Sequence, residues 1–483
     1  MATRLALAAA GAVLWLIVFC NGSLAFAPVL VGRRLGSSSL WMSNQPETVA
    51  IIGGGIAGLS CAQSLAASGD FLPTVFDTGR LRPGGRCSSR FPGDEPKEDD
   101  DPSVHELNYI NKVTIDHAAQ ILSVPPGFDA FGDKVKEWER EGIVRKFPPK
   151  TVCNIANPFD RETKRYIKSQ IRLWPLKGDF YYGVNGMGVI PQTLAKGLDM
   201  HQDVWVSPSS GVRFMEGGGG SPHWRVQGNG KQILGKFDRL VIAHNGKCAD
   251  RLMSRTPARD LHKLLQVNFA PYVPRNGGKR MTLNSIYSLT VAVRGPSVLS
   301  QALPKETFIS GFVKNHPNLR FLSCNTRKHP PEDDDDDDGV EVWTVLSSAK
   351  FGKSHKGPQE FLPTSLREQV TELLLVSLEE SLALTPGQLS SAVLESRLQL
   401  WGAAVPVNTW RPTDQTGFLY DEEFNVGACG DWLLDSSIAG AWESGRRLAQ
   451  HMSSSASASS SSAGLEGKFE ASVAVDKVGI GAL

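Results

Sequence analysis

The sequence predicts an α/β fold, and three observations support this prediction. The segment Val49–Gly69 reads as a short buried strand, a glycine-rich loop and a helix. Pro73–Phe76 reads as a second strand, and Phe424–Met452 reads as another strand, a turn and an amphipathic helix. Strands that alternate with helices in this way build a parallel sheet that helices cover.

Composition limits the number of domains and the kind of partner. The chain has 483 residues, and with two non-globular ends set aside about 400 remain, enough for two or three domains. Lys and Arg number 51 against 50 Asp and Glu, so the charge signature of a nucleic-acid-binding protein is missing. The seven cysteines form no C-x-x-C pair, and the acidic run Pro331–Gly339 is typical of a solvated loop. We therefore predict no metal site.

The N-terminus has the pattern of a targeting segment. Met1–Arg4 carries one positive charge, Leu5–Cys20 is apolar, and residues 23–25 fit a small-x-small cleavage site. This pattern predicts a signal peptide over residues 1–25. A membrane anchor is the alternative, but the apolar run is shorter than the span of about 20 residues that a bilayer needs. We therefore expect no stable membrane span in the mature protein.

The segment after the signal peptide, residues 26–43, is rich in Ser and Arg and has no acidic residue. A signal peptide followed by such a transit-like segment resembles the bipartite presequences of algae with secondary plastids. We therefore expect delivery to a plastid, with the secretory pathway as the alternative. At the other end, the Ser/Ala-rich composition from Ser453 onward predicts a disordered tail over residues 453–483.

The glycine-rich loop has the spacing of a dinucleotide-binding unit. Its glycines permit, in order, a tight turn, a close approach of the backbone to a pyrophosphate, and close packing of the helix on the strand. Free N–H groups at the start of the helix bind the phosphates. We expect cofactor contacts from Gly53, Gly55, Ile56, Ala57 and Gly58. Asp77 ends the second strand and should bind the adenosine ribose, which disfavours NADP.

Two further segments favour FAD over NAD as the cofactor. Gly84 and Gly85 would keep the backbone close to the same pyrophosphate, and Arg86 would add a fixed positive charge. A surface turn with solvated arginines is the alternative for this segment. In the turn Gly430-Asp431-Trp432, Asp431 can bind ribityl hydroxyls, and the positive end of the following helix can face the flavin ring. These contacts from both ends of the chain predict an extended, non-covalently bound FAD.

These residues belong to a longer set of motifs. The chain resembles the renalase family of FAD-dependent amine-oxidase-like oxidoreductases, above all its plant and algal branch, over about Thr48 to Ala449. The segments that carry the resemblance are, in order, "IIGGGIAGLSCA", "GGRCSSR", "IDHAAQ", "YYGVNGMGVIPQTLA", "FDRLVIAHNGKCADRL", "LQLWGAAVP" and "CGDWLLDSSIAGAWESG". The family usually reads D-H-G-A-Q-Y where this chain has Ala118 and Ile121, and it usually has an acidic residue near Ala439.

The resemblance implies a two-domain fold similar to that of p-hydroxybenzoate hydroxylase. A discontinuous Rossmann-like FAD domain would comprise residues 47–122, 184–262 and 418–452, with a buried strand at Val241–Ala243. A smaller substrate domain of mixed or antiparallel sheet plus helices would comprise residues 123–183 and 263–417. It would contain a strand at Val340–Ser348 and a helix starting at Leu366. The substrate pocket would lie between the domains, over the flavin.

The sequence contains no catalytic triad, H-E-x-x-H or phosphoryl-transfer motif. This fits an FAD-dependent oxidoreductase, since the flavin itself accepts the hydride. We therefore name no general base. His117 and Gln120 are candidates for lining the flavin, although a structural histidine is an equal explanation for His117. Trp401 is a candidate for the wall of the substrate pocket, with ordinary core packing as its alternative.

For the substrate, the resemblance implies a small reduced compound of the dihydronicotinamide type, since the renalase family oxidises isomers of reduced nicotinamide dinucleotides. Dioxygen or a plastid electron acceptor would reoxidise the flavin. Two alternatives stay open. One is an amine-oxidase-like or desaturase-like plastid flavoprotein that acts on an amine, a lipid or a pigment. The other is a flavin-bearing assembly factor with little turnover.

Overall fold

The computed structural model describes most of the chain. The described ranges are residues 45–94, 107–160, 162–163, 165–207, 210–216, 221–330, 339–358, 362–455 and 461–472. The predicted signal peptide, transit segment and almost all of the acidic run lie outside these ranges. The described residues from Pro46 onward belong to one compact unit.

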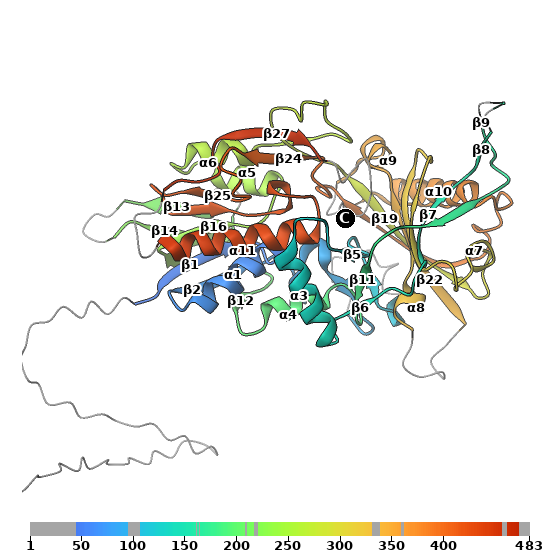
Figure 1. Ribbon diagram of the computed structural model, residues 1–483, viewed down its shortest axis with the longest axis horizontal. Coiled ribbons are helices and arrows are strands. Elements are labelled where there is room, and N and C mark those ends of the chain that lie inside the picture. Colours follow the sequence, from blue (N-terminus) through green and yellow to red (C-terminus); the bar gives the residue numbers. More distant parts are fainter. Residues whose placement is uncertain are drawn as a thin grey trace, which may run out of the picture. The chain divides into compact units, whose positions relative to one another are not determined.

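Helices are interspersed among runs of strands along the chain (Figure 1). The helices are α1 (Ile56–Ser68), α3 (Asp129–Arg140), α4 (Val189–Ala195), α5 (Lys247–Met253), α6 (Arg259–Leu265), α7 (Val298–Ala302), α8 (Asn325–Lys328), α9 (Ala349–Ser354), α10 (Thr364–Ser381) and α11 (Ile438–Ser455). Within the described ranges, none of them combines the length and the hydrophobicity that crossing a membrane requires.

The strands form two large sheets and several small ones. The strands of the large sheets are β1 (Glu47–Ile52), β2 (Phe71–Phe76), β7 (Val152–Ala156), β10 (Arg172–Pro175), β12 (Asp199–His201), β16 (Arg239–Ile242), β19 (Ile286–Arg294), β20 (Ser310–Val313), β21 (Leu319–Cys324), β22 (Val340–Ser347), β23 (Val393–Trp401), β25 (Leu419–Asp421) and β26 (Val426–Ala428). Those of the small sheets are β3 (Ser89–Arg90), β4 (Ile115–Asp116), β5 (Leu122–Ser123), β6 (Val144–Lys146), β8 (Phe159–Asp160), β9 (Arg165–Tyr166), β11 (Phe180–Gly183), β13 (Val212–Met215), β14 (His223–Gln227), β15 (Ile233–Phe237), β17 (Val267–Phe269), β18 (Met281–Leu283), β24 (Asn408–Pro412) and β27 (Gly467–Ala471).

The first large sheet takes its strands from both ends of the chain. Its order is β12-β2-β1-β16-β26-β25, and every pairing is parallel except that of β25 with β26. β1 lies in the middle, and its residues Val49, Ala50 and Ile51 are fully buried. Burial on both faces is why this strand is continuously apolar rather than alternating. The predicted α/β class with a Rossmann-like sheet is confirmed.

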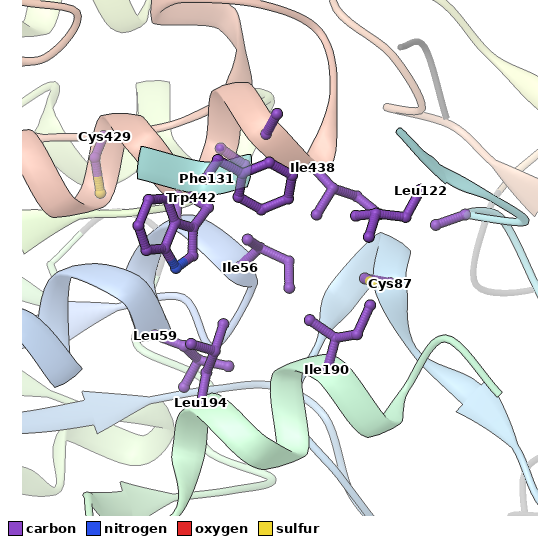
Figure 2. Packing of buried hydrophobic residues seen from close by; sticks show 14 of the residues in the cluster. Ile56, Leu59, Cys87, Leu122, Phe131, Ile190, Leu194, Cys429, Ile438 and Trp442 are labelled. Atoms are coloured by element: carbon purple, nitrogen blue, oxygen red, sulfur yellow. The ribbon is translucent and has the colours of Figure 1, made fainter. Parts of the chain in front are cut away.

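Two helices from opposite ends of the chain pack against each other on this sheet. A Cβ on Gly445 of α11 would come within 2.1 Å of the Ala57 carbonyl oxygen of α1, so only glycine permits this approach. Figure 2 shows Leu59 of α1, Leu194 of α4 and Trp442 of α11 within one buried cluster. The packing of α1 on α11 brings the N-terminal loop and the C-terminal turn to the same edge of the sheet.

The second large sheet has seven strands in the order β10-β7-β20-β21-β22-β19-β23. The pairing of β20 with β7 is parallel and the others are antiparallel, which confirms the predicted mixed sheet. Val370, Leu374 and Leu378 of α10 belong to the same buried cluster as the side chains of this sheet. The strand predicted at Val340–Ser348 is β22, and the helix predicted from Leu366 is α10, which begins two residues earlier.

The strands of the two large sheets separate along the predicted segments. All strands of the first sheet fall within residues 47–122, 184–262 and 418–452, and all strands of the second fall within 123–183 and 263–417. The exact domain boundaries stay a prediction.

The prediction of a disordered tail over residues 453–483 is wrong for part of that segment. β27 pairs antiparallel with β24, and the buried ring of Phe469 lies 5.0 Å from that of Trp410. The Trp410 indole also donates to the Gly464 carbonyl at 2.8 Å. The Ser/Ala-rich composition stops before Leu465, and the apolar residues after it supply enough contacts for a strand. Residues 456–460 and 473–483 lie outside the described ranges.

Candidate functional site

A cavity of about 270 Å³ lies at the carboxyl ends of the parallel strands. Ligands bind at this edge of doubly wound sheets because loops from neighbouring strands separate there. The lining residues come from the segments after β1, β2, β4, β16 and β26, from the start of α11, and from the end of β23 and the residues just after it. They are Gly53, Gly54, Gly55, Ile56, Ala57, Asp77, Thr78, Gly84, Gly85, Arg86, Cys87, Ala119, Ala243, His244, Asn245, Trp401, Ala403, Cys429, Gly430, Asp431, Trp432, Ser437, Ile438 and Ala441.

The glycine-rich loop forms one wall of the cavity. Gly53 has a φ of 120°, and a Cβ there would lie 3.0 Å from the Ala243 carbonyl, so a side chain would be both strained and crowded. Gly58 does not line the cavity; a Cβ on it would come within 2.0 Å of the Gly53 carbonyl oxygen. This is the packing role that the sequence predicts. At Gly55 a Cβ would meet nothing within 4 Å, which leaves space for a ligand against the backbone.

Asp77 stands at the end of β2, beside this loop. Its Oδ1 accepts a hydrogen bond from the Gly54 N–H at 3.2 Å. Burial raises the pKa of this carboxyl, although hydrogen bonds from the backbone of Gly54, Gly79 and Thr78 act in the opposite direction. Among the described residues, no cation pairs with Asp77. Its charge therefore remains available to hydroxyl donors of a ligand.

The second glycine pair is bound directly to the first loop. The Gly84 N–H donates to the Gly54 carbonyl at 2.8 Å, and Gly55 and Gly84 form a parallel bridge. Gly85 has a φ of 54°, and a Cβ there would meet nothing within 4 Å. Two open glycines, Gly55 and Gly85, thus stand close together on the cavity wall, as the predicted approach to one pyrophosphate requires.

Arg86 connects this wall with segments from the other end of the chain. Its Nη1 donates to Asp431 Oδ2 at 2.7 Å and to the Ala404 carbonyl at 2.8 Å. Burial disfavours the charged guanidinium, but Asp431 outweighs it and the pKa of Arg86 is raised. The sequence predicts both side chains as separate ligand contacts. The structure adds that they form one ion pair, so each also holds the other in place.

The start of α11 completes this side of the cavity. Ser437, Ile438 and Ala441 line it, and Gly430-Asp431-Trp432 precedes them in the loop after β26. The first turn of an 18-residue helix therefore faces the cavity. Its free N–H groups and dipole favour negative charge there.

Trp401 lies at the end of β23 and lines the cavity, as the pocket-wall prediction expects. Its indole Nε1 is buried and has no hydrogen-bond partner in the described structure. A buried donor without a partner costs free energy, so this N–H is available to a ligand acceptor. Two lining cysteines are inert by comparison. Burial is the main cause that raises the pKa of Cys87, and the Cys61 thiol contacts Cys429 and raises its pKa.

His117 and Gln120 do not line the cavity, although Ala119 between them does. Burial lowers the pKa of His117 to about 3, with nearby Arg397 and Arg90 acting in the same direction. Gln120 is fully buried, and its side chain bonds the Asp116 carbonyl and Lys328. Their predicted roles at the flavin stay predictions, and the contacts of Gln120 are those of a structural residue.

Sequence reasoning missed the other lining residues. They are Gly54, Thr78, Cys87, Ala119, Ala243, His244, Asn245, Ala403, Cys429, Ser437, Ile438 and Ala441. Ala243, His244 and Asn245 directly follow β16, the third parallel strand, so the rule for strand ends could have identified them. The Nδ1–H of His244 donates to the Ile52 carbonyl oxygen at 3.0 Å, and burial lowers the pKa of His244. It is therefore a neutral structural histidine. No sequence pattern points to Ala403 or Cys87.

The residues of this cavity fit a non-covalently bound FAD. The two open glycines leave room for a pyrophosphate, and within the described part of the chain Asp77 has no cation and the Trp401 N–H has no acceptor. The raised pKa values of Cys87 and Cys429 disfavour the thiolates that covalent attachment would need. Among the described residues, no group of His, Cys, Asp and Glu side chains is arranged to hold a metal ion.

Known proteins share this architecture. Residues 51–131 match the family model described as NAD(P)-binding Rossmann-like domain. The chain is similar to the structure of a protein described as a protoporphyrinogen oxidase from Exiguobacterium sp. 255-15, with a TM-score of 0.54 and 10% identity over 85% of this chain and 99% of that chain. It is also similar to a wild-type putrescine oxidase bound to putrescine, with a TM-score of 0.50 and 13% identity over 84% of this chain and 99% of that chain. At such identities the likeness shows the fold, which is that of these oxidases.

Proposed function

We propose that this protein is an FAD-dependent oxidoreductase that oxidises a small reduced compound of the dihydronicotinamide type. One observation carries the proposal. Gly55, Asp77, Gly85 and Asp431, chosen from sequence patterns more than 300 residues apart, line a single cavity at the carboxyl edge of the parallel sheet. A shorter cofactor would not need the C-terminal part of this wall.

Each part of the wall has a proposed role toward FAD. Gly55 and Gly85 allow the backbone N–H groups to reach the pyrophosphate. Asp77 accepts hydrogen bonds from the adenosine ribose, and Asp431 accepts them from the ribityl chain. Arg86 adds positive charge and, through its bond to the Ala404 carbonyl, ties the cofactor wall to the segment that follows Trp401.

The proposed chemistry is hydride transfer. When bound, FAD would accept a hydride from the substrate and pass the two electrons to dioxygen or to a plastid electron acceptor. The titratable side chains on the wall already have other roles: Asp77 and Asp431 face the cofactor, and His244 is neutral and bonded to the backbone. A dihydronicotinamide needs little help from a base, because its ring donates hydride without first losing a proton.

Identifying the released cofactor tests the first part of the proposal. Acid precipitation of the purified protein should leave yellow FAD in the supernatant, in about equimolar amount to the chain. The precipitate should stay colourless, since no covalent attachment is expected. A protein that yields only FMN, or no flavin, would contradict the assignment of the cavity.

Stopped-flow bleaching of the flavin without oxygen tests the substrate. Isomeric dihydronicotinamides should reduce the flavin faster than ordinary NADH, with putrescine and a reduced porphyrin as comparison compounds. If an amine or a polyene bleaches the flavin rapidly while the dihydronicotinamides do not, the substrate assignment is wrong.

The fold favours a second candidate, an oxidase of amines or of larger ring compounds, because the similar structures are described as putrescine and protoporphyrinogen oxidases. The likeness at these identities extends only to the fold, so we place this candidate second. The third possibility, a flavin-bearing assembly factor with little turnover, would show a flavin that none of these reductants bleaches.

We also propose that the protein is delivered to a plastid. The apolar run, the "FAP" start and the acid-free Ser/Arg segment support this. A fluorescent fusion of residues 1–46 should co-localise with chlorophyll in an alga with secondary plastids. Retention in the secretory pathway would contradict the transit segment, and a fusion of residues 1–25 alone is the control.

A further inference from the structure

Three lysines gather around Phe269, at the end of β17: two lie over its ring and the third contacts its backbone carbonyl. The Lys356 Nζ lies 4.2 Å from the ring centre and the Lys247 Nζ lies 5.7 Å from it. The Lys353 Nζ lies 3.4 Å from the Phe269 carbonyl oxygen. All three lysines are exposed, and they come from α5, from α9 and from the segment after α9. The cluster is therefore assembled by the fold and not by a run of basic residues.

The charges of this cluster are not neutralised within the described structure. No carboxylate pairs with any of the three lysines there, whereas other lysines, such as Lys134 and Lys146, do form ion pairs. Burial lowers the pKa of Lys356, and the nearby charges of Lys353 and Lys247 lower it further. Contact with the ring compensates part of the repulsion. A bound anion would remove the rest, because like charges at short range raise the free energy.

The cluster adjoins the cavity wall on two sides. Asn245 lines the cavity, and Lys247 follows two residues later, so their Cα atoms are at most about 7.6 Å apart. Gly246 between them packs on Ala403, another lining residue, since a Cβ on it would lie 3.4 Å from the Ala403 Cβ.

Lys353, on the other side of the lysine cluster, is also connected to the lining of the cavity. α9 carries Lys353, and its Gly352 packs on the Ser285 carbonyl, where a Cβ would come within 2.1 Å. The neighbouring Asn284 accepts a hydrogen bond from the Val405 N–H at 3.0 Å, close to Ala403. Helix α9 thus packs on the segment before β19, and this segment is hydrogen-bonded to the chain that follows the lining residue Ala403.

We propose that Lys247, Lys353 and Lys356 bind the phosphate group of the substrate at the rim of the cofactor cavity. The inference rests on the proposed function and narrows it: the hydride donor is a phosphate-bearing nucleotide and not a free base. Three ammonium groups at one residue, two over its ring and one at its carbonyl, supply the positive charge that a phosphate or a pyrophosphate requires. The same cluster repels a cationic amine, so it disfavours the amine-oxidising form of the second candidate function.

Two hydride donors that differ only in charge test this proposal. Dihydronicotinamide mononucleotide carries a phosphate, and N-benzyl dihydronicotinamide does not. In the holoenzyme with Lys247→Gln, Lys353→Gln and Lys356→Gln combined, the apparent Kd of the phosphate-bearing donor should rise tenfold or more, while that of the neutral donor changes less than twofold. The matched control combines Lys177→Gln, Lys196→Gln and Lys305→Gln, three exposed lysines elsewhere, and carries the same change in net charge. It should leave both values close to wild type.

The outcomes separate this inference from the proposed function. An unchanged Kd of the phosphate-bearing donor in the cluster variant, or an equal change in the control, overturns the inference and leaves the function standing. If neither donor reduces the wild-type flavin, the proposed substrate fails, and calorimetric titration of the holoenzyme with inorganic pyrophosphate decides the inference. Binding that the cluster variant loses and the control keeps supports the anion site; equal or absent binding in all three proteins overturns it.

Discussion

Asp77 and Asp116 are two buried carboxylates that each end a strand, yet their surroundings are opposite. Among the described residues, Asp77 bonds backbone N–H groups alone, and burial raises its pKa. Asp116 accepts bonds from the Ser89 Oγ at 2.6 Å and the Met187 N–H at 2.7 Å, and it pairs with Lys328 at 2.7 Å.

The cations around Asp116 decide its charge. Burial alone would raise its pKa, but Lys328 and His329 outweigh burial and hold the pKa well below its usual range. The Lys328 side chain is itself fully buried, an unusual state for a lysine. Where the protein supplies the cation, as for Asp116, the acid holds the fold together; where it does not, as for Asp77, the acid is available to a ligand.

The first prediction tests whether the ion pair of Asp116 and Lys328 holds the fold together. Lys328→Met leaves Asp116 buried without its main cation and should lower the free energy of unfolding by about 3–5 kcal/mol. Combining it with Asp116→Asn removes both charges and should recover most of this loss. Urea denaturation at pH 7 measures both variants.

The control for that experiment is another lysine of an ion pair at the surface. Lys134 pairs with Glu137 at 2.6 Å, but the Glu137 side chain is 41% exposed. Lys134→Met should cost about 1 kcal/mol or less. Similar losses in the two lysine variants would show that the Asp116 cluster is not the structural centre that we infer.

A second prediction concerns acid, since His117 adjoins Asp116. The pKa of His117 is lowered to about 3 in the folded protein, whereas an unfolded histidine titrates near 6.5. Between these values the unfolded state takes up the proton and the folded state does not, so stability falls as the pH falls from about 6.5 to 3. His117→Gln should remove on the order of 2–4 kcal/mol of that loss. The Asp116 contribution is lost only below about pH 3.9, which separates the two groups. Parallel curves for both proteins between pH 7 and 4 would refute the assignment.

Asp431 shares one feature with each of these acids. Like Asp116 it pairs with a cation, Arg86, and like Asp77 it lines the cavity. Arg86→Ala and Asp431→Ala should each weaken FAD binding by about 1.5–3 kcal/mol, or about ten- to a hundredfold. Because the two residues share one ion pair, the double variant should lose much less than the sum of the single losses. Flavin occupancy after dialysis and the Kd of FAD measure this.

Arg82, four residues before Arg86, provides the control variant. Arg82 pairs with Asp94 at 2.7 Å and does not line the cavity. Arg82→Ala should leave the Kd of FAD within about twofold of wild type. Full occupancy in both cavity variants, or strictly additive losses, would contradict the placement of the cofactor.

The surroundings of Asp77 and those of Asp116 also differ in how well the sequence predicts them. β1, the glycine loop and Asp77 lie within 31 consecutive residues, so local spacing describes their geometry. Asp116 and Lys328 are 212 residues apart and meet only through tertiary packing. Nothing in the sequence marks Lys328, because a lysine is expected at the surface. Nor does the sequence show that the Gln120 amide bonds the Asp116 carbonyl and Lys328; its predicted place at the flavin stays a prediction.

The sequence predicts the C-terminal part of the cavity lining only in part. The Gly-Asp turn predicts Gly430 and Asp431 at the cavity, but their contact with Arg86 joins residues 345 positions apart and could not be inferred. For the C-terminal tail the prediction from composition is wrong, because the Ser/Ala-rich stretch precedes the apolar residues that build β27. Local patterns thus predict which residues face a ligand, and tertiary contacts decide which of them are already bound within the protein.

The last prediction tests whether Asp77 is available to a ligand. Removing its charge should change the free energy of unfolding only slightly, and in the stabilising direction. Because the pKa of Asp77 is raised in the folded protein, ionising it destabilises the fold as the pH rises above about 3.9. Asp77→Asn keeps an acceptor for the Gly54 N–H and removes the charge. The deflavinated variant should therefore be as stable as wild type at pH 7, or more stable by up to about 1 kcal/mol, and this gain should vanish near pH 3. Its affinity for FAD should fall about tenfold, since the ribose loses a charged acceptor. Urea denaturation and flavin titration of the same preparation measure both quantities. A variant that loses stability and keeps its FAD affinity would place Asp77 with Asp116 among the structural acids.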